Sequence, residues 1–298
     1  MNKWVPDVGP SDRTTDVAAR ALRSRLEAVR HYLRRAVEDP DQPENVHQLR
    51  VWTRRADAAL ALYADLLPSR PMKWLRKWVR RLRRAAGAAR DCDVFARRAV
   101  GLNGLWHKEL RGERRKAQAK IETLYRRLDH GRRLKRRGRK LLAWLDDRDT
   151  GPADRFADLA RARLHPAVAA FFDADPTDPG DAGALHQFRI RGKELRYAME
   201  LLAAAFPARF REELYPVVGT LQDKLGNVND LTVAQRRLQE RIDRAGTPAE
   251  LSELRRQSVA VAEDLVRARS DFRRWWTPES RDGLRQQFAE MFDGPAKR

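Results

Sequence analysis

The sequence contains one cysteine, Cys92, so it can form neither an internal disulfide nor a cysteine-rich zinc site. It has no uninterrupted apolar run close to the ~20 residues that a membrane-spanning helix requires, and its mean hydropathy is −0.72. The start of the chain, MNKWVPDVGP, has no apolar segment of the kind found in signal peptides. We therefore expect a cytoplasmic protein that has no membrane partner.

Sequence patterns of common catalytic sites are also missing. The chain contains no HExxH zinc motif, no GxGxxG or GxxxxGK[ST] phosphate loop and no GxSxG nucleophile motif. Its six histidines include no i,i+4 pair, and the acidic neighbours Asp91 and Asp93 disfavour a thiolate at Cys92. No group of carboxylates suited to Mg²⁺ is evident. These absences favour a non-enzymatic protein without a metal or other cofactor.

Positive charge is in excess, and the excess lies in the first half of the chain. The 62 Lys+Arg and 42 Asp+Glu leave a net charge of +20. Counting gives 38 basic and 19 acidic residues (+19) over residues 1–150, and 24 and 23 (+1) over 151–298. Residues 68–90 contain nine basic and no acidic residues, and residues 111–140 contain fourteen basic and three acidic ones. A single run of this kind is usually a solvated helix face, but this asymmetry indicates a polyanionic partner.

Apolar residues recur every three or four positions, and the alternating pattern of a strand is absent, so we expect an all-α protein. Hydrophobic residues make up 42% of the chain, which suffices for a core. Proline and glycine residues divide the chain into segments. The helices that we expect cover residues 13–38, 45–67, 72–90, 92–100, 105–129, 132–147, 153–174, 184–206, 208–228, 230–245, 248–276 and 279–292.

An internal repeat organises these helices. NVHQLRVWTRRADAAL, from Asn45, aligns with ALHQFRIRGKELRYAM, from Ala184, at an offset of 139 residues. The same offset pairs Gly87 with Gly226 and Asp91 with Asp230 without a gap. We therefore predict a tandem duplication. It divides the chain into an N-terminal extension (1–12), a first helical bundle (13–150) and a second helical bundle (151–298).

Basic side chains of the repeat fall on single faces of the expected helices, because i, i+3, i+7 and i+10 form one stripe. A guanidinium group donates two parallel hydrogen bonds to phosphate oxygens, so rows of arginines suit a linear polyanion. A lone histidine is more often a packed residue than a ligand contact, but its recurrence in His-Gln-x-Arg favours binding. The candidate binding residues are His47, Arg50, Arg54, Arg55, Lys73, Lys77, Arg80, Arg83, Arg84, His186, Arg189, Lys193, Arg196 and Tyr197.

Neighbouring residues have predicted structural roles. We expect Asp57 and Glu200 to orient nearby arginines through ion pairs. We expect Asp91 and Asp230 to cap the N-termini of the helices that follow them. Gly87 and Gly226 are interpreted as positions of close helix packing or bending.

These motifs resemble the CHAD family, the conserved-histidine α-helical domain. The resemblance rests on VHQLRVWTRR (46–55), LRRAAGAARDCDV (82–94), LHQFRIRGKELRYAMELL (185–202) and LQDKLGNVNDLTV (221–233), and covers residues 13–292. It implies two antiparallel helical bundles related by pseudo-twofold symmetry, with a basic channel between them. It also implies binding of inorganic polyphosphate and association with polyphosphate granules. Asp57 stands where the second copy has Arg196, which predicts a lopsided channel.

Two other functions stay open at this point. The basic run 111–140 also suits a nucleic-acid binder, although that function does not explain why the His-Gln-x-Arg stripe is duplicated. The same run would also suit a scaffold that docks acidic proteins at a granule surface. Synthesis or hydrolysis of polyphosphate is the least favoured alternative.

Overall fold

The computed structural model describes residues 1–98, 104–147, 154–176 and 180–293. Over these residues the secondary structure consists of ten α-helices and three short helical turns, without a β-strand, which confirms the all-α prediction. The chain divides into two compact units, Met1–Leu159 and Ala160–Arg298. The boundary predicted near residue 150 falls outside the described residues.

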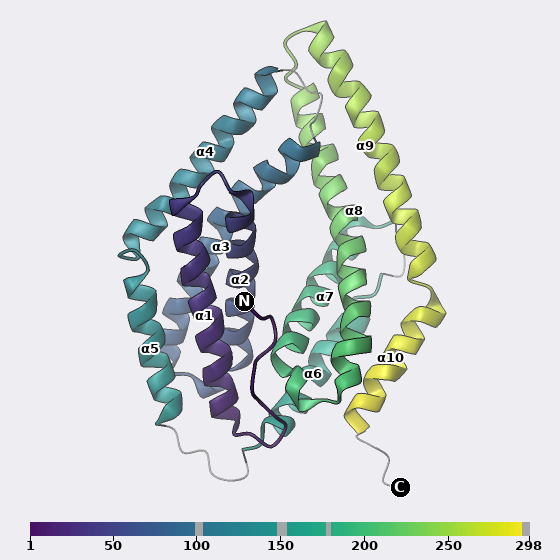
Figure 1. Ribbon diagram of the computed structural model, residues 1–298. Coiled ribbons are helices and arrows are strands. Elements are labelled where there is room, and N and C mark those ends of the chain that lie inside the picture. Colours follow the sequence, from purple (N-terminus) through teal and green to yellow (C-terminus); the bar gives the residue numbers. More distant parts are fainter. Residues whose placement is uncertain (99–103, 148–153, 177–179, 294–298) are drawn as a thin grey trace. The chain divides into compact units, whose positions relative to one another are not determined.

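Unit 1 is a bundle in which the first three helices each pack against the next one in sequence, and the fifth packs against the first (Figure 1). Helix α1 packs against α2 and α5, α2 packs against α3, and α3 packs against α4. Val5, in the predicted N-terminal extension, is buried, and Arg25 donates from Nη2 to the Lys3 carbonyl at 2.8 Å. The extension is therefore part of this unit. The helices are α1 (Thr14–Glu38), α2 (Pro43–Leu62), α3 (Ser69–Arg98), α4 (Gly104–Arg127) and α5 (Arg132–Asp146).

Unit 2 contains most of α6 and four further helices around an aromatic core. Phe171 of α6 stacks on Phe188 of α7, with ring centroids 4.9 Å apart. Trp276 packs 5.7 Å from Phe188 and donates from Nε1 to Asp175 at 2.7 Å. A short π-helix, Phe210–Leu214, leads into α8. The helices are α6 (Phe156–Asp173), α7 (Ala182–Leu202), α8 (Tyr215–Ile242), α9 (Pro248–Trp275) and α10 (Pro278–Asp293).

Two of the predicted helix breaks are wrong. The helices predicted over 72–90 and 92–100 are not separated at residue 91, because α3 runs through it to Arg98; residues 99 and 100 lie outside the described residues. Likewise, the helices predicted over 208–228 and 230–245 are not separated at residue 229, because α8 runs through it. Asp91 and Asp230 are therefore helix-interior residues and cap nothing. The reason lies in the apolar pattern, which continues in phase through both positions. Buried residues on either side are Leu82, Ala86, Ala89 and Cys92 in α3, and Leu225, Val228, Leu231 and Ala234 in α8.

Other predicted boundaries need only small corrections. The helices expected over 45–67 and 184–206 end at Leu62 and Leu202, and each is followed by a short 3₁₀ turn. Throughout the described residues, no helix combines the length and the hydropathy needed to cross a lipid bilayer.

Candidate functional site

Four arginines gather where α2 packs against α3 in unit 1, and we call Arg54, Arg80, Arg83 and Arg84 the arginine cluster. Burial lowers the pKa of Arg83 below its usual value, and the like charges of Arg54, Arg80 and Arg84 lower it further, against the opposing effect of Asp57. Arg54 comes from α2 and the other three come from α3, so both helices contribute positive charge to one place. An arginine stays protonated at neutral pH in such surroundings.

One carboxylate holds three of the neighbouring guanidinium groups. Asp57 of α2 accepts hydrogen bonds from Nε of Arg76 at 3.0 Å, from Nε of Arg80 at 3.0 Å and from Nη1 of Arg83 at 3.3 Å. The Asp57 residue is only 8% exposed. The predicted orienting role of Asp57 is confirmed. Among the described residues, Arg54 and Arg84 have no carboxylate within 4.0 Å, so the cluster keeps a net positive charge.

The remaining candidates of α2 do not all face this cluster. The Nε of Arg50 lies 3.8 Å from where a Cβ would stand on Gly87. The Arg50 side chain therefore lies against α3, next to the cluster. His47 is half-buried on the same stripe of α2. Arg55 instead lies over the ring of Trp52, with its guanidinium carbon 4.7 Å from the ring centroid. Arg55 therefore belongs to a different face of the helix.

Lys73 and Lys77 extend the basic row of α3 away from the cluster. Both side chains are exposed, and they continue the helical spacing of Arg80 and Arg84. Arg76 is not among the candidates predicted from the sequence, but its Nε lies 3.0 Å from Oδ1 of Asp57, beside the arginine cluster. Asp57 lies on α2 and Arg76 on α3, so the spacing of residues along one helix cannot predict this contact between helices.

The corresponding residues of unit 2 lie where α7 packs against α8. His186 lies with Nδ1 3.3 Å from Oδ1 of Asn229, and Arg189 and Lys193 are half-buried further along α7. Arg196 lies over the ring of Tyr197, which is itself buried, at 5.4 Å from the centroid.

A buried acidic group accompanies Arg196. Burial lowers the pKa of Arg196, but the interactions with Tyr197, Tyr215 and Glu200 outweigh it and leave that pKa above its usual value. Glu200 is 1% exposed and accepts a hydrogen bond from the Tyr215 hydroxyl at 2.8 Å. The charge of Arg196 is thus held in place by groups of both helices.

We call the helix pairs α2–α3 and α7–α8 the two hairpins, and the offset of 139 residues relates their positions. It pairs residue 47 with residue 186 and residue 90 with residue 229, and in unit 2 His186 lies beside Asn229. Gln222, which corresponds to Arg83, lies against Gly192, where a Cβ would come within 2.2 Å of its Nε2. The tandem duplication stays a prediction.

The charges of the two hairpins nevertheless differ. At the offset of 139 residues, Lys73, Lys77, Arg80 and Arg84 of α3 correspond to Glu212, Pro216, Gly219 and Asp223. The basic row of α3 therefore has no counterpart on α8 or the turn before it.

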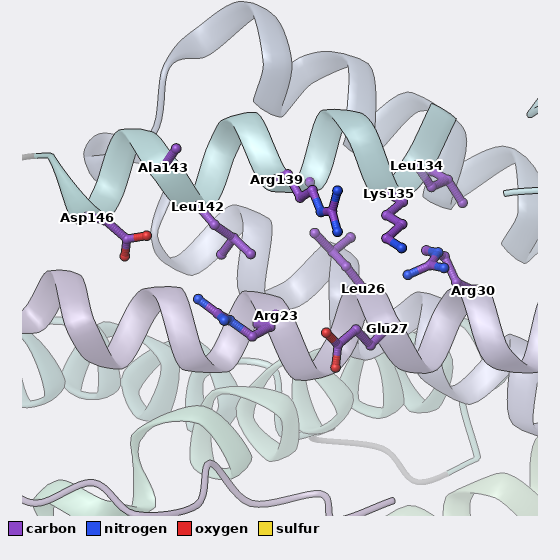
Figure 2. A pocket seen from close by; sticks show the side chains of 11 residues that line it. Arg23, Leu26, Glu27, Arg30, Leu134, Lys135, Arg139, Leu142, Ala143 and Asp146 are labelled. Atoms are coloured by element: carbon purple, nitrogen blue, oxygen red, sulfur yellow. The ribbon is translucent and has the colours of Figure 1, made fainter. Parts of the chain in front are cut away.

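A pocket elsewhere in unit 1 has a mixed lining (Figure 2). It lies between α1 and α5 and has a volume of about 350 Å³. Figure 2 shows Glu27 between Arg23 and Arg30 along α1, with Lys135 and Arg139 reaching from α5 toward them. Asp146 adds a second carboxylate. Because acidic and basic groups alternate here, this pocket suits a linear polyanion less well than the arginine cluster does.

The side chains that could bind a metal lie apart in the described structure. Within the described ranges, no three His, Cys, Asp or Glu side chains converge to form a metal site. Cys92 is buried, with its Sγ 4.0 Å from Oε2 of Glu113. An adjacent carboxylate disfavours the thiolate form of a cysteine.

Comparison with known proteins identifies the family. No curated protein matches the chain. The crystal structure of the CHAD domain from the plant Ricinus communis matches with a TM-score of 0.74 and 23% identity, over 96% of each chain. PptA from Streptomyces chartreusis matches with a TM-score of 0.58 and 19% identity, over 89% of this chain and 99% of that one. At these identities the two structures show a shared fold. The sequence pattern of the CHAD domain matches residues 20–239, and the chain therefore belongs to the CHAD domain family.

Proposed function

We propose that this protein binds inorganic polyphosphate through the arginine cluster of unit 1 and does not turn it over. The observation that carries this proposal is the crowding of Arg54, Arg80, Arg83 and Arg84. Burial lowers the pKa of Arg83, and the like charges of its three neighbours lower it further. Collecting like charges on a half-buried surface costs free energy, and a polyanion lowers that cost. A phosphate chain supplies closely spaced negative charges that guanidinium groups recognise through paired hydrogen bonds.

Membership of the CHAD family supports polyphosphate as the polyanion. The geometry also favours a bare phosphate chain over a single-stranded nucleic acid. Proteins that bind single strands without sequence preference stack the bases on aromatic rings. In the described structure, none of the four cluster arginines lies over an aromatic ring, and their guanidinium groups offer hydrogen bonds and charge alone.

The stripe of α7 is proposed as a second, weaker contact. Arg189, Lys193 and Arg196 carry positive charge on one face of the helix, but α8 adds little charge to them. We expect most of the affinity to come from unit 1. The basic channel, the localisation at polyphosphate granules and the absence of enzymatic activity are parts of the same proposal.

The test is binding of fluorescently labelled polyphosphate, measured for the wild-type chain and for Arg54→Gln/Arg83→Gln. A matched control, Arg244→Gln/Arg255→Gln, removes the same charge from exposed positions of unit 2. Single-stranded DNA, added at equal phosphate concentration, serves as the competitor. Thermal unfolding of each variant verifies that it is folded.

We expect the cluster variant to lose at least tenfold in affinity and the control to lose less than twofold. We also expect DNA to displace little of the bound polyphosphate. Equal losses of affinity in the two variants would mean that binding depends on the net charge of the protein and not on a site at Arg54 and Arg83. Full displacement by DNA would assign the surface to nucleic acid instead.

A further inference from the structure

A groove between α3 and α4 has a lining unlike that of the arginine cluster. Its volume is about 510 Å³. Four cations line it, Arg81 and Arg84 from α3 and Lys120 and Arg127 from α4, and no carboxylate does. Among the described residues, none of these four has a carboxylate within 4.0 Å. The groove is thus a strongly positive surface outside the α2–α3 contact.

The floor of this groove is mostly apolar, and most of its side chains are short. It consists of Ala85, Ala88, Ala119 and Leu124, together with Thr123. The Thr123 hydroxyl donates to the Ala119 carbonyl at 2.8 Å, so this hydrogen already has an acceptor within α4. Because alanine side chains are short, an occupant can approach the helix backbones closely.

This combination discriminates between classes of ligand. A bare phosphate chain has no apolar surface and would gain nothing from a floor of alanine and leucine. A single-stranded nucleic acid would require aromatic rings for its bases, and the lining contains none. An amphipathic helix with carboxylates on one stripe and apolar side chains on another matches both the rim and the floor.

The spacing of the rim also fits a helix. Lys120 and Arg127 are seven residues apart on α4, which is two turns or about 10 Å. Arg81 and Arg84 are three residues apart, or nearly one turn, on α3. Carboxylates at i, i+3 or i+4 and i+7 of an incoming helix would meet these cations in order.

We propose that the α3–α4 groove docks an acidic amphipathic helix of a partner protein. Its apolar stripe would lie on Ala88 and Ala119, and its carboxylates would pair with Lys120 and Arg127. This site is separate from the proposed polyphosphate site, although Arg84 borders both. The test therefore leaves Arg84 unchanged.

The experiment measures fluorescence anisotropy of a labelled synthetic helix of about 18 residues, or five turns, with glutamates on one stripe and leucines and alanines on the other. A scrambled peptide of the same composition keeps the charge and removes the amphipathic pattern. In the full-length chain, Ala88→Gln/Ala119→Gln fills the floor without changing charge, at two exposed positions that tolerate a larger side chain. Lys120→Gln/Arg127→Gln removes the rim charge. Arg136→Gln/Lys140→Gln, at exposed positions of α5, is the charge-matched control.

We expect the patterned peptide to bind, the scrambled one to bind at least tenfold more weakly, and both groove variants to lose at least tenfold. The α5 control should lose less than twofold. Equal binding of the two peptides, or unchanged binding to Ala88→Gln/Ala119→Gln, would overturn the proposal.

Polyphosphate is titrated into the same variants. If filling the floor weakens polyphosphate instead of the peptide, the groove belongs to the polyphosphate surface and the docking proposal is wrong. The polyphosphate proposal itself is decided separately, by Arg54→Gln/Arg83→Gln.

Discussion

Replacing Asp57 with asparagine removes a negative charge that pairs with three arginines where α2 packs against α3. The asparagine keeps the size of the side chain and one oxygen acceptor, but it no longer offsets Arg76, Arg80 and Arg83. If polyphosphate binds this cluster, Asp57 competes with the phosphates for the same guanidinium groups. We therefore expect Asp57→Asn to bind polyphosphate more tightly and to unfold more easily.

Both effects can be estimated. A unit charge about 6 Å from a bound phosphate interacts with it by about 0.7 kcal/mol at a dielectric constant of about 80 and by about 2.8 kcal/mol at about 20. Solvent and salt at this partly exposed site bring the effect toward the lower figure, or roughly 1 kcal/mol and about fivefold in affinity. One additional phosphate neutralised would steepen the dependence of log K on log salt by about 0.7. The three arginine side chains are 27%, 44% and 36% exposed, so solvent screens their pairs with Asp57. A loss of about 1–2 kcal/mol in the free energy of unfolding follows for the variant.

The assay is polyphosphate binding at four salt concentrations, combined with urea unfolding of the free protein. Asp264→Asn is the control, because Asp264 is exposed and pairs with Arg267, at 2.6 Å, in unit 2. It changes the net charge equally and should alter affinity less than twofold. Weaker or unchanged binding by Asp57→Asn, with an unchanged salt slope, would refute the reasoning that Asp57 competes with phosphate.

Three further predictions concern unit 2 and turnover. Gln222 is 5% exposed, and among the described residues neither of its amide atoms has a hydrogen-bond partner. Gln222→Met should therefore stabilise the protein by about 1 kcal/mol and raise Tm by about 2–4 °C, and a lower Tm in thermal unfolding would contradict this. Tyr215→Phe removes the hydroxyl that donates to the buried carboxylate of Glu200, and urea unfolding should show a loss of about 1.5–3 kcal/mol. A loss below measurement error would mean that this hydrogen bond is replaced. Prolonged incubation with polyphosphate and Mg²⁺ should leave the phosphate chain length unchanged on gels, and progressive shortening would contradict a non-enzymatic role.

Much of the fold is predictable because the helix-forming signals are local. The apolar spacing of the chain gave the helices and the all-α class, and proline and glycine located most of their ends. The errors fell at Asp91 and Asp230, where a residue favoured at helix N-termini stands inside a longer helix. Packing of the apolar residues on both sides of each aspartate outweighs its local preference for a cap.

The positive charge of the candidate site was predictable from the sequence, but several of its side-chain contacts were not. Helical spacing predicted that Arg50 and Arg54 share one face of α2 and that Lys73, Lys77, Arg80 and Arg84 form one row on α3, because one periodicity governs each helix. It could not show that Arg55 turns to Trp52, since that choice depends on an aromatic neighbour. Nor could it show that Asp57 gathers three arginines of another helix, because that contact depends on how α2 and α3 pack.

The most direct test of polyphosphate binding by the arginine cluster is the salt dependence of affinity for the wild-type chain, Arg54→Gln/Arg83→Gln and Arg244→Gln/Arg255→Gln. Each phosphate contact contributes about 0.7 to the slope of log K against log salt if the polymer behaves as a single strand. The loss of two contacts should therefore make the slope of the cluster variant shallower by about 1.4 and leave that of the control unchanged. Equal slopes for all three proteins would contradict a binding site at Arg54 and Arg83.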